Sequence, residues 1–497
     1  MFGNRAIVHR EFRASVKQMC GVLAHLGIGR GDRFAVLSKN SPEYVGLWFA
    51  GLLGQGILCP LNIRTKDVEL TYILNDCGAK LVFCDAACME SVARIRSEVP
   101  ALQHVVLLDG AEDLPEWEGL RISDILTSVP PTLPPEPDED DVCLIMYTGG
   151  TTGLPKGVVI DQRRLTLSLY RAIIHFEHSE HTIWLQALPI FHVAALSSMV
   201  CPILCGGTLV LMASFDPAAT LDQIEACKVT STGFIPTMYA MIFNHPAFRP
   251  DRIASLRMLG YGGAPMMEAL LDRIFACCPD ARIYQSYGMT EASGIVTTLE
   301  PYVHRLRDER LKSVGRAVIG VEIAIRDAGG ALLPAGDIGE IILRSGSMLK
   351  QYWNLPELTA KALTGGWYAT GDVGYLDDQG YLFIVDRLKD MIISGGENIY
   401  SVEVENALST HPSIAEVALI GVPHDLWGEA AHAVIVRRTG TDLTPEEVRR
   451  FAQDRLANFK VPKSFDIRIE PLPLSSAGKV LKRQLREEYQ RGTASAG

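Results

Sequence analysis

The chain has 497 residues and a formal net charge of −11, with 47% hydrophobic and 21% charged side chains. This length exceeds what one hydrophobic core usually supports, so two or more domains are expected, and the composition is that of a soluble globular protein. The negative charge argues against nucleic acid as the main partner, because a phosphate backbone attracts a basic face.

The cysteines and the apolar stretches indicate the cellular compartment and the relation to membranes. Eleven cysteines are spaced irregularly up to Cys278 and form no Cys-x-x-Cys metal or redox pattern, which favours a reducing cytoplasm. The N-terminus opens no long apolar region, so no secretory signal is expected. The longest apolar stretch, 197–213, is interrupted by Pro202, Gly206 and Gly207. We expect a cytoplasmic protein without a transmembrane segment and with at most peripheral membrane contact.

The first part of the chain alternates between helical and strand-like patterns. Helices are predicted at 12–26 and 44–53, and strands at 33–37, 57–59 and 80–84. This alternation is typical of parallel α/β layers. A proline-rich stretch at 130–137 and four acidic residues at 138–141 then predict an exposed connector.

A loop rich in glycine and threonine follows the strand predicted at 142–146. It reads Thr148-Gly149-Gly150-Thr151-Thr152-Gly153-Leu154-Pro155-Lys156-Gly157. Glycines allow backbone N–H groups to form an anion nest, hydroxyls add donors and Lys156 adds a cation, so the loop suits a polyphosphate. An ordinary turn is the alternative, but the order of threonines, proline and lysine disfavours it. The P-loop pattern does not fit, since Gly157 stands where a hydroxyl must follow the lysine.

Further motifs follow, and each has a simpler alternative. They are Pro189-Ile190-Phe191-His192, Gly260-Tyr261-Gly262-Gly263-Ala264-Pro265, Gln285-Ser286-Tyr287-Gly288-Met289-Thr290-Glu291, Thr370-Gly371-Asp372, and Asp386-Arg387. A lone histidine in apolar company is more often a packed core residue than a catalyst, and Gly-Gly turns are common. Asp372 is suited to accept both hydroxyls of a ribose, with the capping of a turn as the alternative.

The composition changes after residue 387. Helices are predicted at 402–408 and 445–456, and strands at 414–421, 431–437 and 465–469, which together indicate a small α+β domain. Towards its end the domain carries the segment Leu474-Ser475-Ser476-Ala477-Gly478-Lys479-Val480-Leu481-Lys482-Arg483.

In this order, the motifs resemble those of the adenylate-forming superfamily, which includes acyl-CoA synthetases, luciferases and adenylation domains of peptide synthetases. The resemblance covers nearly the whole chain, although Gly149 stands where the family usually has serine and Ala477 where it usually has threonine. The family's chains begin with some further residues, so this N-terminus is expected to be short. The resemblance implies an α/β fold with a large N-terminal domain of several subdomains at 1–387, which binds ATP and the acyl substrate. A small, mobile α+β domain at 388–497 would carry the catalytic lysine.

The resemblance also implies a nucleotide site. Tyr287 would stack on adenine, Thr290 would meet the α-phosphate, Asp372 and Arg387 would hold the ribose, and Glu291 would hold Mg²⁺, which prefers oxygen ligands. The implied ATP and AMP residues are Thr148, Gly149, Gly150, Thr151, Thr152, Gly153, Lys156, Gly263, Ala264, Pro265, Gln285, Ser286, Tyr287, Gly288, Thr290, Asp372 and Arg387. The implied catalytic residues are Lys479, Thr290, Glu291 and His192.

Sites for the other substrates are implied in the same way. The acyl pocket would be lined by His192, Ala194, Ser198, Gly262, Gly263 and Gly288. Coenzyme A would contact Gly395, Gly396, Trp427 and Phe459, and Lys389 would be the hinge between two domain arrangements. Val461 stands where benzoate-type ligases have an arginine, so the nucleotide end of CoA must be gripped differently.

The expected reaction is ATP-dependent ligation of a small carboxylic acid to CoA through an acyl-adenylate. CoA is the expected acceptor because the chain ends soon after Lys479 and leaves no carrier domain. Plant cinnamate ligases tend to carry tyrosine where Ala194 stands, so a medium- or long-chain fatty acid is the preferred substrate. Alternatives are an aryl-CoA ligase of the benzoate or cinnamate type, a luciferase-like oxygenase, and a stand-alone amino-acid adenylation enzyme, which usually has aspartate where His192 stands. An inactive nucleotide sensor would be expected to lack Lys479, Glu291 or Asp372. A homodimer is left open.

Overall fold

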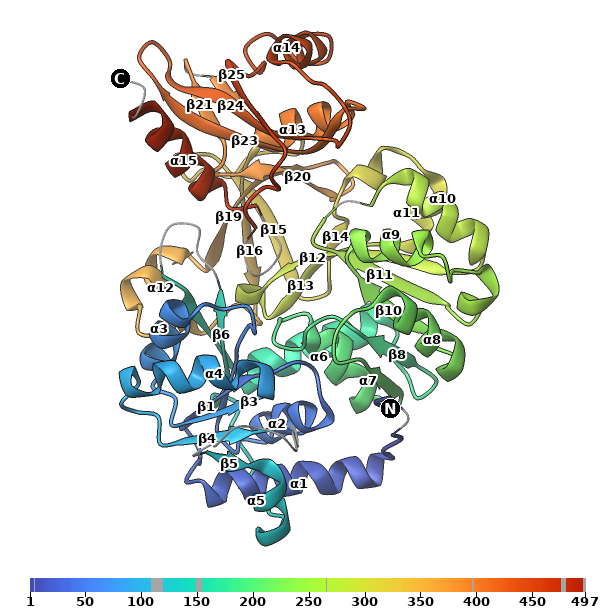
Figure 1. Ribbon diagram of the computed structural model, residues 1–497, viewed down its shortest axis with the longest axis vertical. Helices are drawn as coiled ribbons and strands as arrows, with labels where there is room; N and C mark the ends of the chain where they lie inside the picture. The colour runs from blue at the N-terminus through green and yellow to red at the C-terminus, as the bar shows by residue number, and fades with distance from the viewer. Residues whose placement is uncertain are drawn as a thin grey trace. The chain divides into compact units, whose positions relative to one another are not determined.

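The computed structural model describes residues 1–3, 5–108, 119–148, 154–264, 266–395, 397–474 and 480–494. The chain divides into two compact units (Figure 1). The larger comprises Met1–Gly150, Leu154–Glu322 and Arg344–Tyr368, and the smaller comprises Ile323–Leu343 and Ala369–Gly497. The predicted fold class, α/β with a large N-terminal part and a small C-terminal part, is confirmed. The domain boundary between residues 387 and 388 stays a prediction.

The first sheet of the larger unit has eight strands in the order β17-β7-β6-β2-β1-β3-β4-β5. Their bounds are β1 (Arg33–Leu37), β2 (Ile57–Pro60), β3 (Leu81–Cys84), β4 (His104–Leu107), β5 (Leu120–Arg121), β6 (Val142–Thr148), β7 (Lys156–Asp161) and β17 (Gln351–Tyr352). The strands from β6 to β5 run parallel, whereas β7 runs antiparallel to both β6 and β17. The predicted parallel layers are therefore present.

Two helices cover this sheet with apolar side chains. They are α3 (Asp67–Cys77) and α4 (Ala86–Ile95), whose Leu70, Leu74 and Val92 are fully buried against the strands. The sequence sets their ends: Gly78 closes α3 in the left-handed conformation that glycine adopts readily, and the Asp85 side chain accepts the N–H of Cys88 to cap α4.

The second sheet of the larger unit has seven strands in the order β14-β13-β12-β11-β10-β8-β9. Their bounds are β8 (Ile183–Gln186), β9 (Thr208–Leu211), β10 (Ser231–Phe234), β11 (Met258–Gly262), β12 (Arg282–Met289), β13 (Gly294–Leu299) and β14 (Arg316–Ala317). The five strands from β9 to β12 are parallel, and β13 is antiparallel to β12. Since the carboxyl ends of parallel strands meet at one edge, the segments that follow these five strands gather there.

The remaining helices of the larger unit surround the two sheets (Figure 1). Helices α8 (Pro217–Cys227), α9 (Pro236–Asn244) and α10 (Glu268–Cys277) contribute to one apolar core with strands β8 to β12. The others are α1 (His9–His25), α2 (Pro42–Leu52), α5 (Ile122–Ser128), α6 (Gln162–Phe176), α7 (Cys201–Leu204), α11 (Pro301–Leu306) and α12 (Pro356–Ala362).

Two further sheets complete the fold. One contains β15 (Val321–Arg326), β16 (Gly339–Ser345), β18 (Leu363–Thr364), β19 (Trp367–Leu376) and β20 (Leu382–Arg387), with β20 paired to β19. The other has the order β22-β21-β24-β23, with β25 paired to β24; its bounds are β21 (Ile392–Ser394), β22 (Glu397–Ile399), β23 (Ile414–His424), β24 (Gly428–Arg437) and β25 (Ser464–Arg468).

Alternation along the C-terminal strands gives this last sheet two apolar faces. Alternate residues of β24 belong to two separate cores, as expected for side chains that point to opposite faces of a sheet. Helices α13 (Ser401–Ser409) and α14 (Pro445–Gln453) pack on one face, and α15 (Lys482–Ala494) packs on the other through Leu485. The predicted helices and strands of this region are present with shifted ends, whereas α15 was not predicted.

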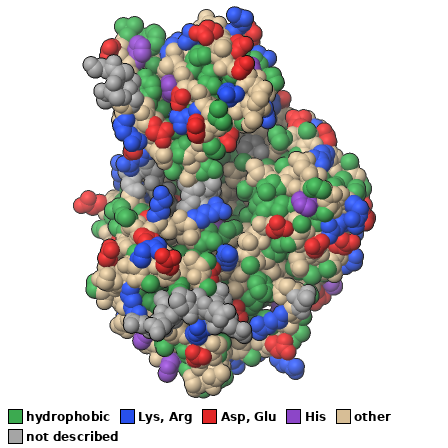
Figure 2. Space-filling view, in the orientation of Figure 1, with side chains coloured by type: hydrophobic (Ala, Val, Ile, Leu, Met, Phe, Trp, Pro, Cys, Tyr) green, Lys and Arg blue, Asp and Glu red, His purple; other side chains and the backbone are tan. Residues whose placement is uncertain are grey.

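Three further observations concern apolar helices, cysteines and surface charge. In the part of the chain that the structure describes, no helix combines the length and apolarity needed to cross a bilayer. All eleven cysteines are free thiols. On the face drawn in Figure 2, lysine and arginine side chains are interspersed with aspartate and glutamate.

Candidate functional site

The ends of the predicted phosphate loop are held by strand pairing. Thr148 is the last residue of β6 and Lys156 the first of β7, and the two are cross-strand partners. Both side chains are half-buried. The Lys156 ammonium lies over the ring of Tyr352, 5.6 Å from its centroid, because β17 pairs with β7. The hairpin therefore presents a cation at the carboxyl end of β6.

Tyr352 also connects this hairpin to the motif at the end of β12. Its hydroxyl donates to Glu291 Oε1 at 3.2 Å and lies 3.0 Å from the hydroxyl of Tyr368. The main-chain carbonyl of Glu291 accepts the N–H of Leu349 at 2.6 Å. Burial, reinforced by the Glu291 carboxylate, raises the pKa of both tyrosines, so they stay neutral donors. Lys156 and Glu291, predicted from separate motifs, thus meet around one tyrosine.

Sequence reasoning missed the roles of Tyr352 and Tyr368. Tyr368 stands beside the predicted Thr370-Gly371-Asp372 motif, so its position was a usable signal. Tyr352 belongs to a strand of two residues, for which local periodicity gives no signal.

The predicted adenine segment lies at the carboxyl edge of the second sheet. Gly262 ends β11, Gly263 and Ala264 follow it on the surface, and Gln285, Ser286 and Tyr287 lie within β12. The adjacent strands pair in parallel from Met258 with Arg282 to Gly262 with Ser286, which brings the two motifs side by side. Such an edge is where open α/β sheets bind ligands.

A buried hydrogen-bond network supports this edge from below. The hydroxyl of Tyr261 lies 3.1 Å from Gln285 Oε1 and 3.0 Å from His304 Nε2, and His304 Nδ1 lies 3.1 Å from the carbonyl of Glu300. Burial lowers the pKa of His304 to about 4, so the ring is neutral at physiological pH. Gln285 is 6% exposed, which makes it a support for the edge as well as a predicted nucleotide residue. His304 was not predicted.

At two of the predicted site positions, Gly288 and Gly262, the close approach of the neighbouring strand leaves no room for a Cβ. A Cβ on Gly288 would lie 2.2 Å from the carbonyl oxygen of Gly294, where the pairing of β12 with β13 shifts register. A Cβ on Gly262 would lie 2.7 Å from the carbonyl oxygen of Ser286. Gly263 differs, because its φ is +78° and the space around a Cβ is open apart from Ile235 at 3.7 Å.

The predicted acyl-pocket segment follows β8. His192 is exposed, so the alternative of a packed core histidine does not hold. The carbonyl of Ala194 accepts the hydroxyls of Ser197 at 3.0 Å and Ser198 at 2.9 Å, which turns both hydroxyls towards the backbone. Buried Asn40, which was not predicted, fixes the preceding loop by donating to the Leu188 carbonyl at 3.0 Å and accepting the Ile190 N–H at 2.9 Å.

In the smaller unit, the two residues predicted to hold a ribose, Asp372 and Arg387, contact each other. Asp372 of β19 and Arg387 of β20 are cross-strand partners, and Arg387 Nε lies 3.4 Å from Asp372 Oδ1. The carboxylate side chain is 10% exposed and the guanidinium side chain 45% exposed. Gly371, at φ +73°, directs the strand at this point, and its carbonyl accepts the N–H of Leu388 at 2.9 Å. Lys389 follows directly in an exposed turn.

The predicted CoA residues fall into two groups. Gly395 adopts φ +61°, donates its N–H to the Trp427 carbonyl at 2.9 Å and packs against the Trp427 ring. His424 stacks on that ring with centroids 4.2 Å apart, and the Lys463 ammonium lies 5.1 Å from it. Phe459 lies in the loop between α14 and β25 and is 39% exposed.

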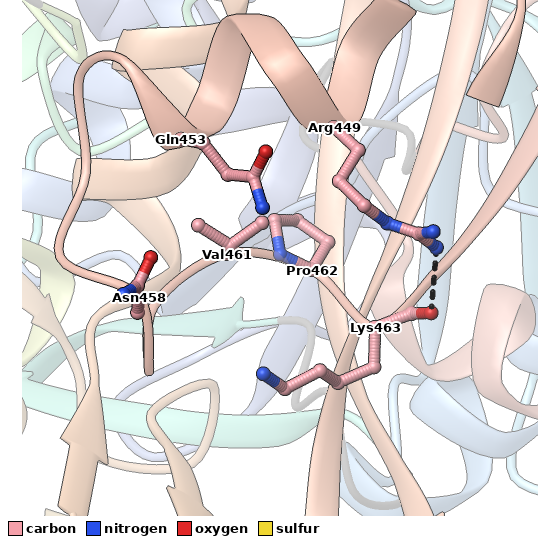
Figure 3. A pocket seen from close by; sticks show the side chains of 6 residues that line it. All are labelled: Arg449, Gln453, Asn458, Val461, Pro462 and Lys463. Carbon is pink, nitrogen blue, oxygen red and sulfur yellow. Dashed lines mark hydrogen bonds between the residues drawn. The ribbon is translucent and has the colours of Figure 1, made fainter. Parts of the chain in front are cut away.

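A basic pocket adjoins the loop of Phe459. Its volume is about 520 Å³, and Figure 3 shows its lining of Arg449, Gln453, Asn458, Val461, Pro462 and Lys463. Arg449 is fixed by donating to the main-chain carbonyl of Lys463 at 3.3 Å and by lying over the Phe465 ring. The lining thus offers two cations and two amides, a set suited to phosphate oxygens.

The Glu291 carboxylate is a suitable ligand for a magnesium ion that is bound together with a nucleotide. Mg²⁺ is usually bound through one or two carboxylates, with substrate phosphates and water completing its octahedron. Over the residues that the structure describes, no three His, Cys, Asp or Glu side chains cluster as a metal site. The carboxylate predicted to contribute is that of Glu291.

Some predicted residues lie outside the described ones. They are Gly149, Gly150, Thr151, Thr152 and Gly153 of the phosphate loop, Pro265, Gly396 and Lys479. Their roles stay predictions.

Comparison with known proteins identifies the family. The profile of the AMP-binding enzyme family matches residues 1–353, and that of the AMP-binding enzyme C-terminal domain matches residues 403–479. The chain belongs to the AMP-binding enzyme family, within the adenylate-forming superfamily, so the predicted resemblance is confirmed.

Relatives with assigned names are similar over nearly their full length. The feruloyl-CoA synthase of an Amycolatopsis species is 37% identical, over 98% of this chain and 95% of the relative. The long-chain-fatty-acid–CoA ligase FadD13 of Mycobacterium tuberculosis is 35% identical, over 97% and 93%. The crystal structure of ATP-bound MatB from Rhodopseudomonas palustris has a TM-score of 0.87 at 29% identity, over 98% of this chain and 95% of that chain. The chain is an AMP-forming acyl-CoA synthetase.

Proposed function

We propose that this protein activates a medium- or long-chain fatty acid as its acyl-adenylate and transfers the acyl group to CoA. ATP-dependent acid–CoA ligation is the activity of the family members it resembles, and the acid is the part that is proposed. The observation that supports a fatty acid comes from the segment after β8. There Ala194 has only a methyl side chain, and the hydroxyls of Ser197 and Ser198 donate to its main-chain carbonyl. An apolar wall with little side-chain volume suits an alkyl chain.

In the first half-reaction, a carboxylate oxygen of the acid attacks the α-phosphorus of ATP, and pyrophosphate leaves. The chain's task is to hold two anions together and to offset the charge that develops at phosphorus. We assign Lys156 and the loop after Thr148 to the terminal phosphates, Thr290 to the α-phosphate and Lys479 to the developing charge. Glu291 would hold Mg²⁺, which neutralises phosphate charge when bound.

The rest of the nucleotide would be held by the remaining predicted residues. Tyr287 would stack on the adenine at the carboxyl edge of the second sheet, and Asp372 would accept the ribose hydroxyls. Asp372 is suited to this because a carboxylate accepts both hydroxyls, and Arg387 lies beside it as a counter-ion. No protein nucleophile is needed in this step.

In the second half-reaction, the CoA thiol attacks the acyl carbonyl and AMP leaves. We assign Gly395, Gly396 and Trp427 to the pantetheine arm and the pocket in Figure 3 to the nucleotide end. Arg449 and Lys463 would supply the positive charge there, in place of the arginine that benzoate-type ligases have where Val461 stands. Location in the cytoplasm and a homodimer stay predictions.

The test is a panel of acids assayed for pyrophosphate release and for acyl-CoA formation at saturating ATP and CoA. Medium- and long-chain fatty acids should exceed ferulate, cinnamate and benzoate in kcat/KM by about tenfold or more, the discrimination that a few apolar contacts provide. The second candidate is an aryl acid, favoured by the similarity to feruloyl-CoA synthase. A kcat/KM for ferulate above that of every fatty acid would select it and reject our proposal.

A further inference from the structure

A buried polar cluster in the smaller unit plays no part in the proposed chemistry. It is formed by Asp386 near the end of β20, Ser401 and Glu405 of α13, and Lys482, the first residue of α15. Asp386 is 2% exposed and Ser401 is fully buried. The side chains of Lys482 and Glu405 are 14% and 19% exposed. Buried charges of this kind need partners, and the cluster supplies them.

The contacts form one continuous chain. The Asp386 carboxylate accepts both the main-chain N–H of Ser401 and its hydroxyl, the latter at 3.0 Å. The Lys482 ammonium donates to Ser401 Oγ at 2.6 Å and to Glu405 Oε1 at 2.7 Å. Glu405 Oε1 also accepts the N–H of Leu419 at 2.7 Å. Lys482 is thus the cation between two buried carboxylates, both of whose pKa values are raised by burial.

A second contact lies one helical turn along α15. Arg486 Nη2 is 3.1 Å from Asp390 Oδ1, so the helix contacts Asp390 directly through Arg486 and is linked to Asp386 through Lys482 and Ser401. The segment 386–390 contains Lys389, the predicted hinge. On its upstream side, Asp386 and Arg387 are fixed in the β19–β20 ladder opposite Val373 and Asp372.

The cluster therefore joins a residue upstream of Lys389 to residues downstream of it. A change of backbone angles at Lys389 would turn Ser401 and Lys482 together relative to Asp386, and the two hydrogen bonds from Ser401 could not both survive. Lys482 follows Lys479 by three residues, a distance of chain that spans at most about 10 Å. Fixing Lys482 thus limits where Lys479 is able to reach.

We propose that Lys482 and Ser401 are positioning residues for acyl-adenylate formation, which latch the start of α15 to Asp386 and so hold the preceding segment with Lys479 in place for that step. The proposal rests on the proposed function of Lys479. The latch is made in the arrangement used for adenylation and is released before thioester formation.

Ser401 allows a graded test because it is the first residue of α13. Ser401→Ala removes the hydroxyl and keeps the N–H, whereas Ser401→Pro removes both donors at a position where helices accept proline. Tyr400 has φ −83° and ψ 118°, a conformation compatible with a following proline. Lys482→Met removes the cation, and Lys482→Arg restores one. Arg483→Ala is the matched control, since Arg483 is 59% exposed and, among the described residues, pairs along its own helix with Glu487.

The two half-reactions are measured separately, as pyrophosphate release without CoA and as acyl-CoA formation from supplied acyl-adenylate. We expect Lys482→Met and Ser401→Pro to slow the first by about ten- to a hundredfold, as misplacement of a catalytic group does, and to leave the second within about twofold. Ser401→Ala should lie between these and the wild type, and Lys482→Arg should recover most of the rate. Equal losses in both half-reactions, or the same loss in Arg483→Ala, would overturn the proposal.

Amide hydrogen exchange tests the latch independently of the proposed enzymatic function. Without substrate, Lys482→Met should speed exchange at the Ser401 and Leu419 amides by about tenfold, because both donate to carboxylates of the cluster. Unchanged exchange there would show that no latch exists, whatever the activity. If the wild type adenylates no acid, the proposed function fails while this measurement still decides the latch.

Discussion

The contact between Tyr352 and Glu291 gives a prediction whose size follows from the structure. Tyr352→Phe removes the hydroxyl that donates to Glu291 Oε1 and keeps the ring beside Lys156. A hydrogen bond to a charged acceptor contributes about 1.5–3 kcal/mol, and the 3.2 Å separation is longer than usual for two oxygens, so the lower value applies. About 1.5 kcal/mol corresponds to roughly tenfold in rate.

The assay is single-turnover pyrophosphate release at limiting ATP and Mg²⁺, without CoA. Tyr352→Phe should lower kcat/KM for ATP about tenfold and leave thioester formation from supplied acyl-adenylate unchanged. Tyr368→Phe is the control, because it removes only the contact between the two hydroxyls at 3.0 Å and should cost about threefold or less. A normal rate for Tyr352→Phe, or equal losses in the two variants, would refute the placing of Glu291 in the adenylation step.

Four further predictions concern other parts of the molecule. Lys479→Ala should slow adenylation by about a hundredfold or more and spare thioester formation, measured as the two half-reactions; equal loss in both would contradict its role. Ala194→Tyr should lower kcat/KM for the largest acids about ten- to a hundredfold by overpacking, with small acids affected less; a uniform loss across an acid panel would remove Ala194 from the pocket. Gly288→Ala should destabilise the larger unit by about 3 kcal/mol in chemical denaturation, because its Cβ would collide with the backbone of Gly294 and Ile295, whereas Gly263→Ala should cost about 1 kcal/mol for its positive φ. Burial lowers the pKa of His304 to about 4, whereas in the unfolded chain this histidine binds a proton near pH 6.5. The free energy of unfolding should therefore be unaffected by His304 above pH 6.5 and lower by about 2 kcal/mol at pH 5. His304→Gln should reduce this pH dependence of the unfolding free energy, and an unchanged pH dependence would be evidence against burial of a neutral ring.

The sequence predicted those parts of the fold that local patterns control. The strand at 33–37 has its predicted bounds, and the helix predicted at 402–408 is α13, one residue longer at each end. Strand β24 begins at Gly428 and not at 431, because Gly-Glu-Ala carries little strand preference and only pairing with β23 extends the strand. Helix α15 was not predicted because its exposed residues are mostly charged and leave a narrow apolar stripe.

The candidate site was predictable where a motif places residues next to one another and not where distant segments meet. Thr148 and Lys156 are cross-strand partners at the two ends of one loop, as the motif implies. The contact of Glu291 with Tyr352 joins residues 61 apart through a strand of only two residues, and the support of Gln285 by Tyr261 requires the pairing of β11 with β12. Such contacts arise from tertiary structure, which periodicity does not report.

The close approach of β12 and β13 at Gly288 constrains how this enzyme could acquire new acids, by evolution or in the laboratory. Gly288 is predicted to line the acyl pocket, and a glycine at such a position invites the introduction of side chains that would shorten the pocket. At Gly288 every such side chain would collide with the neighbouring strand before it met a ligand. Variation in acid preference is therefore expected to accumulate on the segment around Ala194 and Ser198, and substitutions at Gly288 are expected to lower stability without a gain of new acids.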